Sequence, residues 1–148
     1  MKYKNIFITG STGVVGKPLL RKIVNQGHNV FALSRSKNNN QLFSDLGVIK
    51  IEGDLFSDST YDQLSDKNID AFFHIAGVNK MCFKNPDGMF KANIEGTKQM
   101  LELGNRLKIK KFIYTSSAVT LVEELGTVGN ELSSTEATFL VNMKSQSF

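Results

Sequence analysis

One stretch near the N-terminus decides the fold: Ile6-Phe7-Ile8-Thr9-Gly10-Ser11-Thr12-Gly13-Val14-Val15-Gly16. It joins a short apolar run, a glycine-rich turn and the start of a helical pattern, in that order. The backbone N–H groups and the helix dipole at such a turn can hold a pyrophosphate. The stretch therefore predicts a dinucleotide site, with binding residues Gly10, Ser11, Thr12, Gly13, Val14, Val15 and Gly16.

Each glycine of this turn has an expected task. Gly10 permits the tight turn, Gly13 lets the backbone approach the phosphates, and Gly16 lets helix and strand pack closely. A glycine-rich turn without a ligand is the simpler alternative. A P-loop does not fit, because five residues rather than four separate Gly10 from Gly16, and Pro18, which follows Lys17, has no hydroxyl for magnesium.

Short β-branched and aromatic runs alternate along the chain with longer stretches of helical period. This alternation is typical of βαβ units and a parallel sheet. We therefore expect an α/β protein with a three-layer Rossmann fold, a doubly wound parallel sheet of about five strands in the order 3-2-1-4-5. The expected strands are Ile6–Thr9, Val30–Ser34, Val48–Ile51, Ala71–Ile75 and Lys111–Thr115.

Two helices follow from the spacing of apolar residues. The first is expected from Gly13 to Gln26, with Pro18 in its opening turns. The second follows Pro86, and the polar stretch 36–41 is expected to be a loop. Residues from about 134 to 148 resemble the opening of another helix. The inner stripe of the second helix is expected to hold Met89, Phe90, Asn93, Ile94, Thr97, Met100 and Leu101.

Composition narrows the class of protein. With 148 residues, 41% hydrophobic and 22% charged, the chain is expected to form a single domain over residues 1–148. Cys82 is the only cysteine, which excludes an internal disulfide and the usual structural zinc sets, so no metal is expected. The apolar run near the N-terminus is too short for a signal peptide, which favours a cytoplasmic protein. The net charge is +4, but the lysines are spread along the chain, which argues against a nucleic-acid partner.

The end of the second expected strand bears on which dinucleotide binds. The sequence there is Leu33-Ser34-Arg35-Ser36-Lys37, without the carboxylate that accepts the ribose hydroxyls of NAD. Arg35 can offer a planar cationic fork to a 2′-phosphate, and Ser34 or Ser36 a hydroxyl. We therefore expect NADP to be preferred to NAD. In the alternative, Arg35 stacks on the adenine or lies in solvent.

Five segments carry motifs in a fixed order along the chain. They are Thr9–Gly16, Gly53-Asp54-Leu55, His74-Ile75-Ala76-Gly77, Asn93-Ile94-Glu95-Gly96-Thr97 and Tyr114-Thr115-Ser116-Ser117-Ala118. Together they resemble the short-chain dehydrogenase/reductase superfamily, in its extended NAD-dependent epimerase/dehydratase branch. The resemblance covers essentially the whole chain and implies an NAD(P)-binding protein of oxidoreductase or epimerase type.

The resemblance implies roles for residues beyond the glycine turn. Ser117 would be the active-site serine. Asn93 would either contact the cofactor or hydrogen-bond the backbone between strands. Asp54 would either contact the adenine or be a solvated aspartate in a turn. For His74, a core histidine with a backbone partner is favoured over a catalytic role. The implied cofactor-binding residues are Ser34, Arg35, Asp54, Leu55, Ile75, Ala76, Gly77, Asn93 and Thr115.

The resemblance does not extend to the pair of residues that carries the family's catalysis. The family needs Tyr-x-x-x-Lys after the serine, and the best-aligned residues here are Asn142 and Gln146. Whether the chain is an enzyme is therefore open: it is expected to be catalytically impaired, or else a non-catalytic nucleotide-binding or sensor module, or a fragment of a longer reductase. The chain also stops before the substrate lobe of extended members, and an unpaired last strand favours a homodimer. A carbonyl compound or sugar nucleotide would be the substrate class.

Overall fold

The computed structural model describes residues 3–79 and 87–117. The chain divides into two compact units, residues 1–115 and 116–148. The first unit contains a five-stranded sheet whose neighbouring strands all pair in parallel, in the order β3-β2-β1-β4-β5. The strands are β1 (Asn5–Thr9), β2 (Asn29–Ser34), β3 (Ile49–Glu52), β4 (Ala71–His74) and β5 (Lys111–Tyr114).

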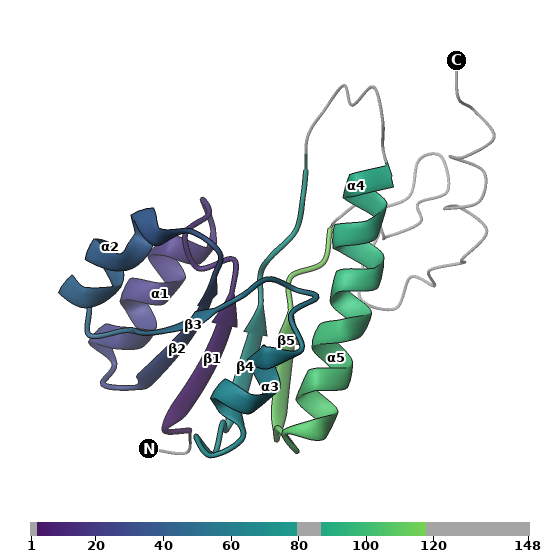
Figure 1. Cartoon of the computed structure of the whole chain (residues 1–148). Helices are drawn as coiled ribbons and strands as arrows, with labels where there is room; N and C mark the ends of the chain where they lie inside the picture. The colour runs from purple at the N-terminus through teal and green to yellow at the C-terminus, as the bar shows by residue number, and fades with distance from the viewer. Residues whose placement is uncertain (1–2, 80–86, 118–148) are drawn as a thin grey trace, which may run out of the picture. The chain divides into compact units, whose positions relative to one another are not determined.

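Helices connect these strands, and one of them contains a wide turn. A 3₁₀ turn precedes α2, and a π turn separates α4 from α5, so the last two form one continuous helical segment (Figure 1). π turns inside helices often lie at functional sites. The elements are α1 (Gly16–Asn25), the 3₁₀ turn Lys37–Asn39, α2 (Asn40–Asp45), α3 (Ser59–Leu64), α4 (Asp87–Phe90), the π turn Lys91–Glu95 and α5 (Gly96–Arg106).

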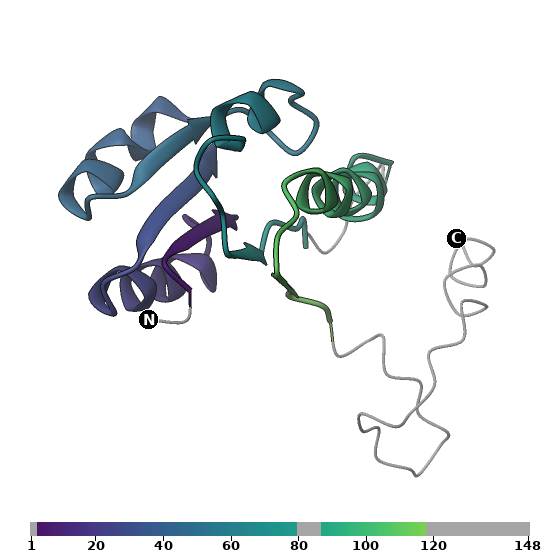
Figure 2. The same ribbon diagram turned by 90° about the horizontal axis from the view of Figure 1, so that it is seen from below.

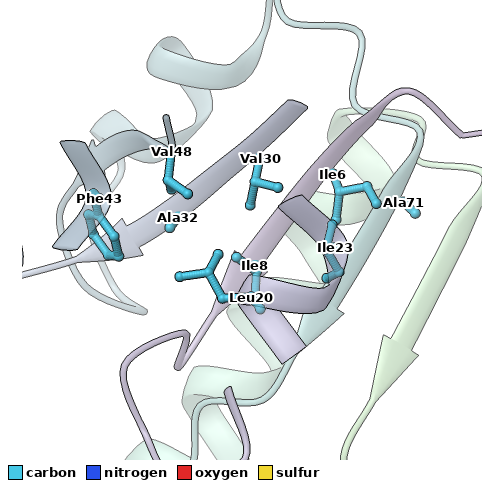
Figure 3. Close-up of a cluster of buried hydrophobic side chains, with 9 residues drawn as sticks. All are labelled: Ile6, Ile8, Leu20, Ile23, Val30, Ala32, Phe43, Val48 and Ala71. Carbon is cyan, nitrogen blue, oxygen red and sulfur yellow. The ribbon is translucent and has the colours of Figure 1, made fainter. Parts of the chain in front are cut away.

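The core lies on both faces of the sheet, because successive strand residues point to opposite sides. Helices α1 and α2 cover one face, and α3 and α5 cover the other (Figures 1 and 2). Figure 3 shows the first cluster, which consists of Ile6, Ile8, Leu20, Ile23, Val30, Ala32, Phe43, Val48 and Ala71. The second consists of Phe7, Phe31, Leu33, Ile51, Leu64, Ile69, Phe72, Met100 and Leu103.

The predicted Rossmann topology and strand order are confirmed, with strand ends displaced by about one residue. Three local expectations were wrong. Helix α1 begins at Gly16 rather than Gly13 and ends at Asn25, because residues 11–15 form the turn itself. The stretch 36–41 is not a loop, since it forms the 3₁₀ turn and the start of α2, capped by the Ser36 hydroxyl. Ile94 and Leu101 are exposed rather than on the inner stripe.

Within the described ranges, no helix is long and apolar enough to cross a bilayer. The same ranges contain no group of three or more side chains suited to hold a metal ion.

Asp70 forms hydrogen bonds at the edge of the sheet where the strands begin. Its Oδ2 accepts hydrogen bonds from the backbone N–H groups of Lys4 at 2.8 Å and Asn5 at 3.1 Å, just where β1 begins. Its Oδ1 accepts one from Lys110 Nζ at 3.2 Å. These backbone hydrogen bonds, with the lysine charge, hold the pKa of the Asp70 carboxyl below its usual value. The ionised form is therefore favoured in the folded state.

Asp70→Asn is expected to lower the free energy of unfolding by about 1–2 kcal/mol at neutral pH, because hydrogen bonds to a charged group are stronger than neutral ones. Urea denaturation measures the change. The matched control is Asp66→Asn, since the Asp66 pair with Lys67 lies in solvent and should contribute nothing measurable. Equal destabilisation by the two substitutions would contradict this account of Asp70.

Candidate dinucleotide-binding site

The segments predicted to bind the cofactor meet at one edge of the sheet. All neighbouring strands run parallel, so the residues that follow each strand lie at the same carboxyl edge. The backbone confirms how closely these ends approach: Ile75 N donates to Thr9 O at 3.3 Å, and Gly53 N donates to Ser34 O at 3.5 Å. The glycine turn, the β2 end, the β3 end and the β4 end thus border a single edge.

Two glycines are required by the packing of the turn. Gly10 has a φ of +69°, and a Cβ there would lie 2.6 Å from the backbone nitrogen of Ala76. A Cβ on Gly16 would overlap the carbonyl oxygen of Gly10 and lie 2.9 Å from Ser11 Cα. Any side chain at either position must therefore displace backbone atoms. The turn lies directly against the segment that follows β4.

Gly13 differs from its two neighbours. It is exposed, its φ is not positive, and a Cβ there would lie 3.4 Å from the carbonyl oxygen of Gly10. An alanine could fit at this position with little adjustment. Neither the packing nor the backbone conformation explains a glycine here, and the absence of a side chain leaves this exposed backbone open to close approach.

The opening of α1 presents backbone hydrogen-bond donors. The N–H groups of Val14 and Val15 find no acceptor among the residues that the structure describes. No acidic side chain lies in the first turn of this described helix to offset its positive end. Within the turn, Ser11 is 1% exposed, and its hydroxyl has no partner within the described chain. Such an arrangement is suited to an anion that brings several acceptor oxygens.

At the end of β2, Arg35 differs from the two serines beside it in its hydrogen-bond partners and exposure. Ser34 Oγ accepts from Asn39 Nδ2 at 3.0 Å, and Ser36 Oγ accepts from the Asn38 N–H at 3.1 Å. Both hydroxyls thus hold the local turn. Arg35 and Lys37 are exposed, and neither has an ion pair among the described residues. The cationic groups at this end are available to a ligand.

The β3 end is shaped by Asp54 and Leu55. Asp54 Oδ1 accepts from the Phe56 N–H at 2.9 Å and from Ser57 Oγ at 3.0 Å, so one of its oxygens holds its own turn. Leu55 packs on Gly96, where a Cβ would lie 2.7 Å from Leu55 Cδ1. The glycine of the Asn93–Thr97 motif therefore lets α5 pack closely on the β3 end.

The β4 end is held by the π turn. Asn93 Oδ1 accepts from the Val78 N–H at 2.7 Å, and its Nδ2 donates to the Val78 carbonyl at 2.9 Å. The structure thus brings Asn93 to the backbone that follows β4, which is one of its two expected roles. Ile75, Ala76 and Gly77 precede this contact and lie between it and β4.

His74 is completely buried at the end of β4, where its ring stacks on Tyr114 at a centroid distance of 5.6 Å. Its partners are the hydroxyls of Thr9, at 2.7 Å from Nδ1, and Thr97, at 3.1 Å from Nε2. Burial lowers the pKa of His74 to about 4. The ring is therefore neutral at physiological pH, and its partners are side chains rather than the expected backbone group.

The remaining predicted residues follow β5. Thr115 N donates to the His74 carbonyl at 3.1 Å, which keeps Thr115 at the same edge. Ser117 belongs to the second unit, residues 116–148. Asn142 and Gln146 lie outside the described residues.

Comparison with known proteins identifies the family. The model of the NAD dependent epimerase/dehydratase family matches residues 6–140. The chain belongs to this family. Membership implies binding of a nicotinamide dinucleotide, and the confirmed strand order agrees with it.

Curated relatives are longer than this chain. The sterol-4-alpha-carboxylate 3-dehydrogenase, decarboxylating, of Dictyostelium discoideum is 28% identical over 103 residues, which are 70% of this chain and 31% of the relative. The 2-alkyl-3-oxoalkanoate reductase of Shewanella oneidensis is 28% identical over 124 residues, 83% of this chain and 31% of the relative. The chain spans between 31% and 41% of the first three curated relatives it matches.

A solved structure agrees on the fold. The UDP-glucose-4-epimerase of Stenotrophomonas maltophila, crystallised with bound NAD and formylated UDP-arabinopyranose, superposes with a TM-score of 0.73. The match covers 97% of this chain and 47% of that one, at 21% sequence identity. At this identity the likeness shows the fold alone.

Proposed function

We propose that this chain binds a nicotinamide dinucleotide at the carboxyl edge of the sheet and prefers NADP to NAD. The observation that carries the proposal is the opening of α1, where the Val14 and Val15 N–H groups and the buried Ser11 hydroxyl have no partner among the described residues. A diphosphate supplies acceptors for the two N–H groups. When bound, the dinucleotide would supply hydride transfer.

The residues around this opening fit the rest of a dinucleotide. Gly13 allows the backbone to approach the diphosphate, because it is exposed and carries no side chain. Asp54 and Leu55 would border the adenine, and the segment Ile75–Gly77 the nicotinamide ribose. Asn93 would act through the backbone of Val78, which it holds, rather than touch the cofactor.

Arg35 carries the proposed preference for NADP. It is exposed at the β2 end, close to where the adenosine ribose of a bound dinucleotide would lie. Arg35→Ser is expected to weaken NADP binding by about tenfold to a hundredfold and NAD binding by much less, since only NADP has a 2′-phosphate. Calorimetric titration of the wild type and the variant with both cofactors measures the two affinities.

Arg106→Ser is the matched control for that titration. Arg106 lies at the C-terminus of α5 with its guanidinium 4.0 Å from the centroid of the Tyr61 ring, and α5 ends at the opposite edge of the sheet (Figure 1). Its loss should leave the ratio of the two affinities unchanged. Wild-type binding of NAD as tight as NADP would refute the preference.

We further propose that catalysis is impaired. By the family resemblance Ser117 would hydrogen-bond the reacting oxygen of a carbonyl or sugar-nucleotide substrate, while Asn142 and Gln146 replace the acid/base tyrosine and its lysine. An amide does not exchange a proton near neutral pH, so loss of the acid/base group lowers the rate by about 10²–10⁴. The same replacement favours a second candidate function, a nucleotide-binding or sensor module without turnover.

Oxidation of NADPH in the presence of simple aldehydes and ketones distinguishes these candidates. We expect no turnover by the wild type and a measurable rate in the double variant Asn142→Tyr, Gln146→Lys. Turnover by the wild-type chain would refute the impairment. Absence of turnover in the double variant, with cofactor binding intact, would favour the sensor module.

We also propose a cytoplasmic homodimer that contacts through the helical segment after residue 87. Ile94 and Leu101, seven residues apart, are 43% and 45% exposed, and burial of both against a second copy would remove their apolar surface from water. Leu101→Glu is therefore expected to convert dimers into monomers in sedimentation equilibrium. A wild-type monomer at micromolar concentration would overturn the dimer.

A further inference from the structure

A continuous set of hydrogen bonds passes through the interior at the binding edge. Thr9 Oγ1 lies 2.7 Å from His74 Nδ1, and His74 Nε2 lies 3.1 Å from Thr97 Oγ1. Thr97 Oγ1 in turn donates to the carbonyl of Asn93, at 2.7 Å. The imidazole therefore joins β1 to the first turn of α5, with β4 between them.

The direction of every hydrogen bond in this set is determined. The Thr97 hydroxyl gives its hydrogen to the Asn93 carbonyl, so its oxygen can only accept from His74, and Nε2 carries the proton. Nδ1 is then an acceptor and takes the hydrogen of the Thr9 hydroxyl. The Thr9 oxygen itself accepts from the Ala76 N–H at 3.3 Å. A neutral imidazole in one tautomer satisfies the whole set.

Each end of the set holds a segment that borders the proposed site. Thr9 immediately precedes Gly10, and Gly10 packs against Ala76, whose N–H bonds Thr9. At the other end, Asn93 fixes both backbone groups of Val78. The glycine turn, the segment after β4 and the π turn are thus connected through His74.

We propose that His74 is a positioning residue for dinucleotide binding. It is completely buried, so it does not touch the ligand, and it sets the spacing between the glycine turn and the segment 75–78. The proposal rests on the dinucleotide function proposed above. Packing alone does not call for an imidazole here, because the surrounding rings of Phe72, Phe112 and Tyr114 would accept an aliphatic side chain.

Two substitutions distinguish the effect of the His74 hydrogen bonds from the effect of its volume in the core. His74→Leu keeps the volume and removes both ring nitrogens, while His74→Gln returns one acceptor and one donor on a single planar group. NADP affinity is measured by calorimetry, and thermal unfolding is followed by circular dichroism. We expect His74→Leu to bind NADP about tenfold more weakly than the wild type while it is still folded, and His74→Gln to recover most of the loss.

Thr97→Val tests the same set if His74→Leu does not fold. It is nearly isosteric and removes the acceptor for Nε2, so NADP affinity should again fall. Thr60→Val is the matched control, because it makes the same chemical change at a buried threonine whose hydroxyl has no partner within the described chain. Its affinity for NADP should equal that of the wild type.

The outcomes distinguish the two proposals. If the wild type does not bind NADP or NAD, the proposed function fails, and the role of His74 fails with it. If the wild type binds and either folded variant, His74→Leu or Thr97→Val, binds equally well, only the role of His74 is overturned. Nitrogen-15 shifts of the imidazole give a second readout: a protonated Nδ1 at neutral pH would contradict the proposal, and a protonated Nε2 supports it.

Discussion

Gly16→Ala is expected to reduce dinucleotide affinity at least about a hundredfold, or to prevent folding of the first unit. The added Cβ would overlap the carbonyl oxygen of Gly10, and no flexible side chain is available to move aside. Gly88→Ala is the matched control, because no described residue lies within 4 Å of a Cβ at that position. Calorimetry with NADP and circular dichroism, run on both variants, measure binding and folding.

Gly13→Ala, in the same turn, distinguishes an effect on ligand binding from an effect on folding. The Cβ fits 3.4 Å from the Gly10 carbonyl oxygen, so we expect the variant to fold as the wild type does. A methyl group at this exposed position should hinder a diphosphate bound to the turn, and NADP affinity should fall at least about tenfold. Unchanged affinity in a folded Gly13→Ala protein would contradict the proposed placement of the phosphates.

Acid should destabilise the protein through His74. Its pKa is lowered from 6.5 to about 4 by burial, so the unfolded chain takes up a proton between these values and the folded chain does not. Stability from this group is therefore complete above pH 6.5 and is lost as the pH falls towards 4. The loss amounts to about 3 kcal/mol. Urea denaturation across this pH range measures it.

His74→Leu supplies the control for this pH dependence. The variant lacks the imidazole, so its stability should change about 3 kcal/mol less than that of the wild type between pH 6.5 and 4. Asp70 does not interfere, because its pKa is lowered from 3.8 and its contribution is lost only at still lower pH. Parallel pH curves for the two proteins would rule out a buried neutral His74.

Much of the fold is predictable from local patterns. The strands follow from short apolar runs, and alternate residues of β1 and β2 divide between the two core clusters, as Ile6 and Phe7 illustrate. Ends differ by a residue because hydrogen bonding, not hydrophobicity, defines them. The glycine turn could be placed because strand, turn and helix occur in sequence, with Gly10 and Gly16 where packing requires them.

Other features depend on tertiary contacts that a sequence does not display. The polar run 36–41 has little apolar periodicity, yet it becomes helical because Ser36 caps it and Phe43 beyond it enters the core. Ile94 has the spacing of an inner residue, but the π turn around it displaces the helix register. The partners of His74 could not be inferred, since Thr9 and Thr97 are 88 residues apart. The only available signal was Thr9 itself, a threonine that ends a buried strand and precedes a glycine.

Calorimetric titration of the folded wild-type chain with NADP and NAD tests the central claim most directly. We predict saturable binding of both at a single site, with NADP the tighter, because the open N–H groups at the start of α1 donate to a diphosphate and Arg35 donates to a further phosphate. A chain with native circular dichroism that releases no binding heat with either dinucleotide at millimolar concentration, and shows no shift in thermal unfolding, would contradict it.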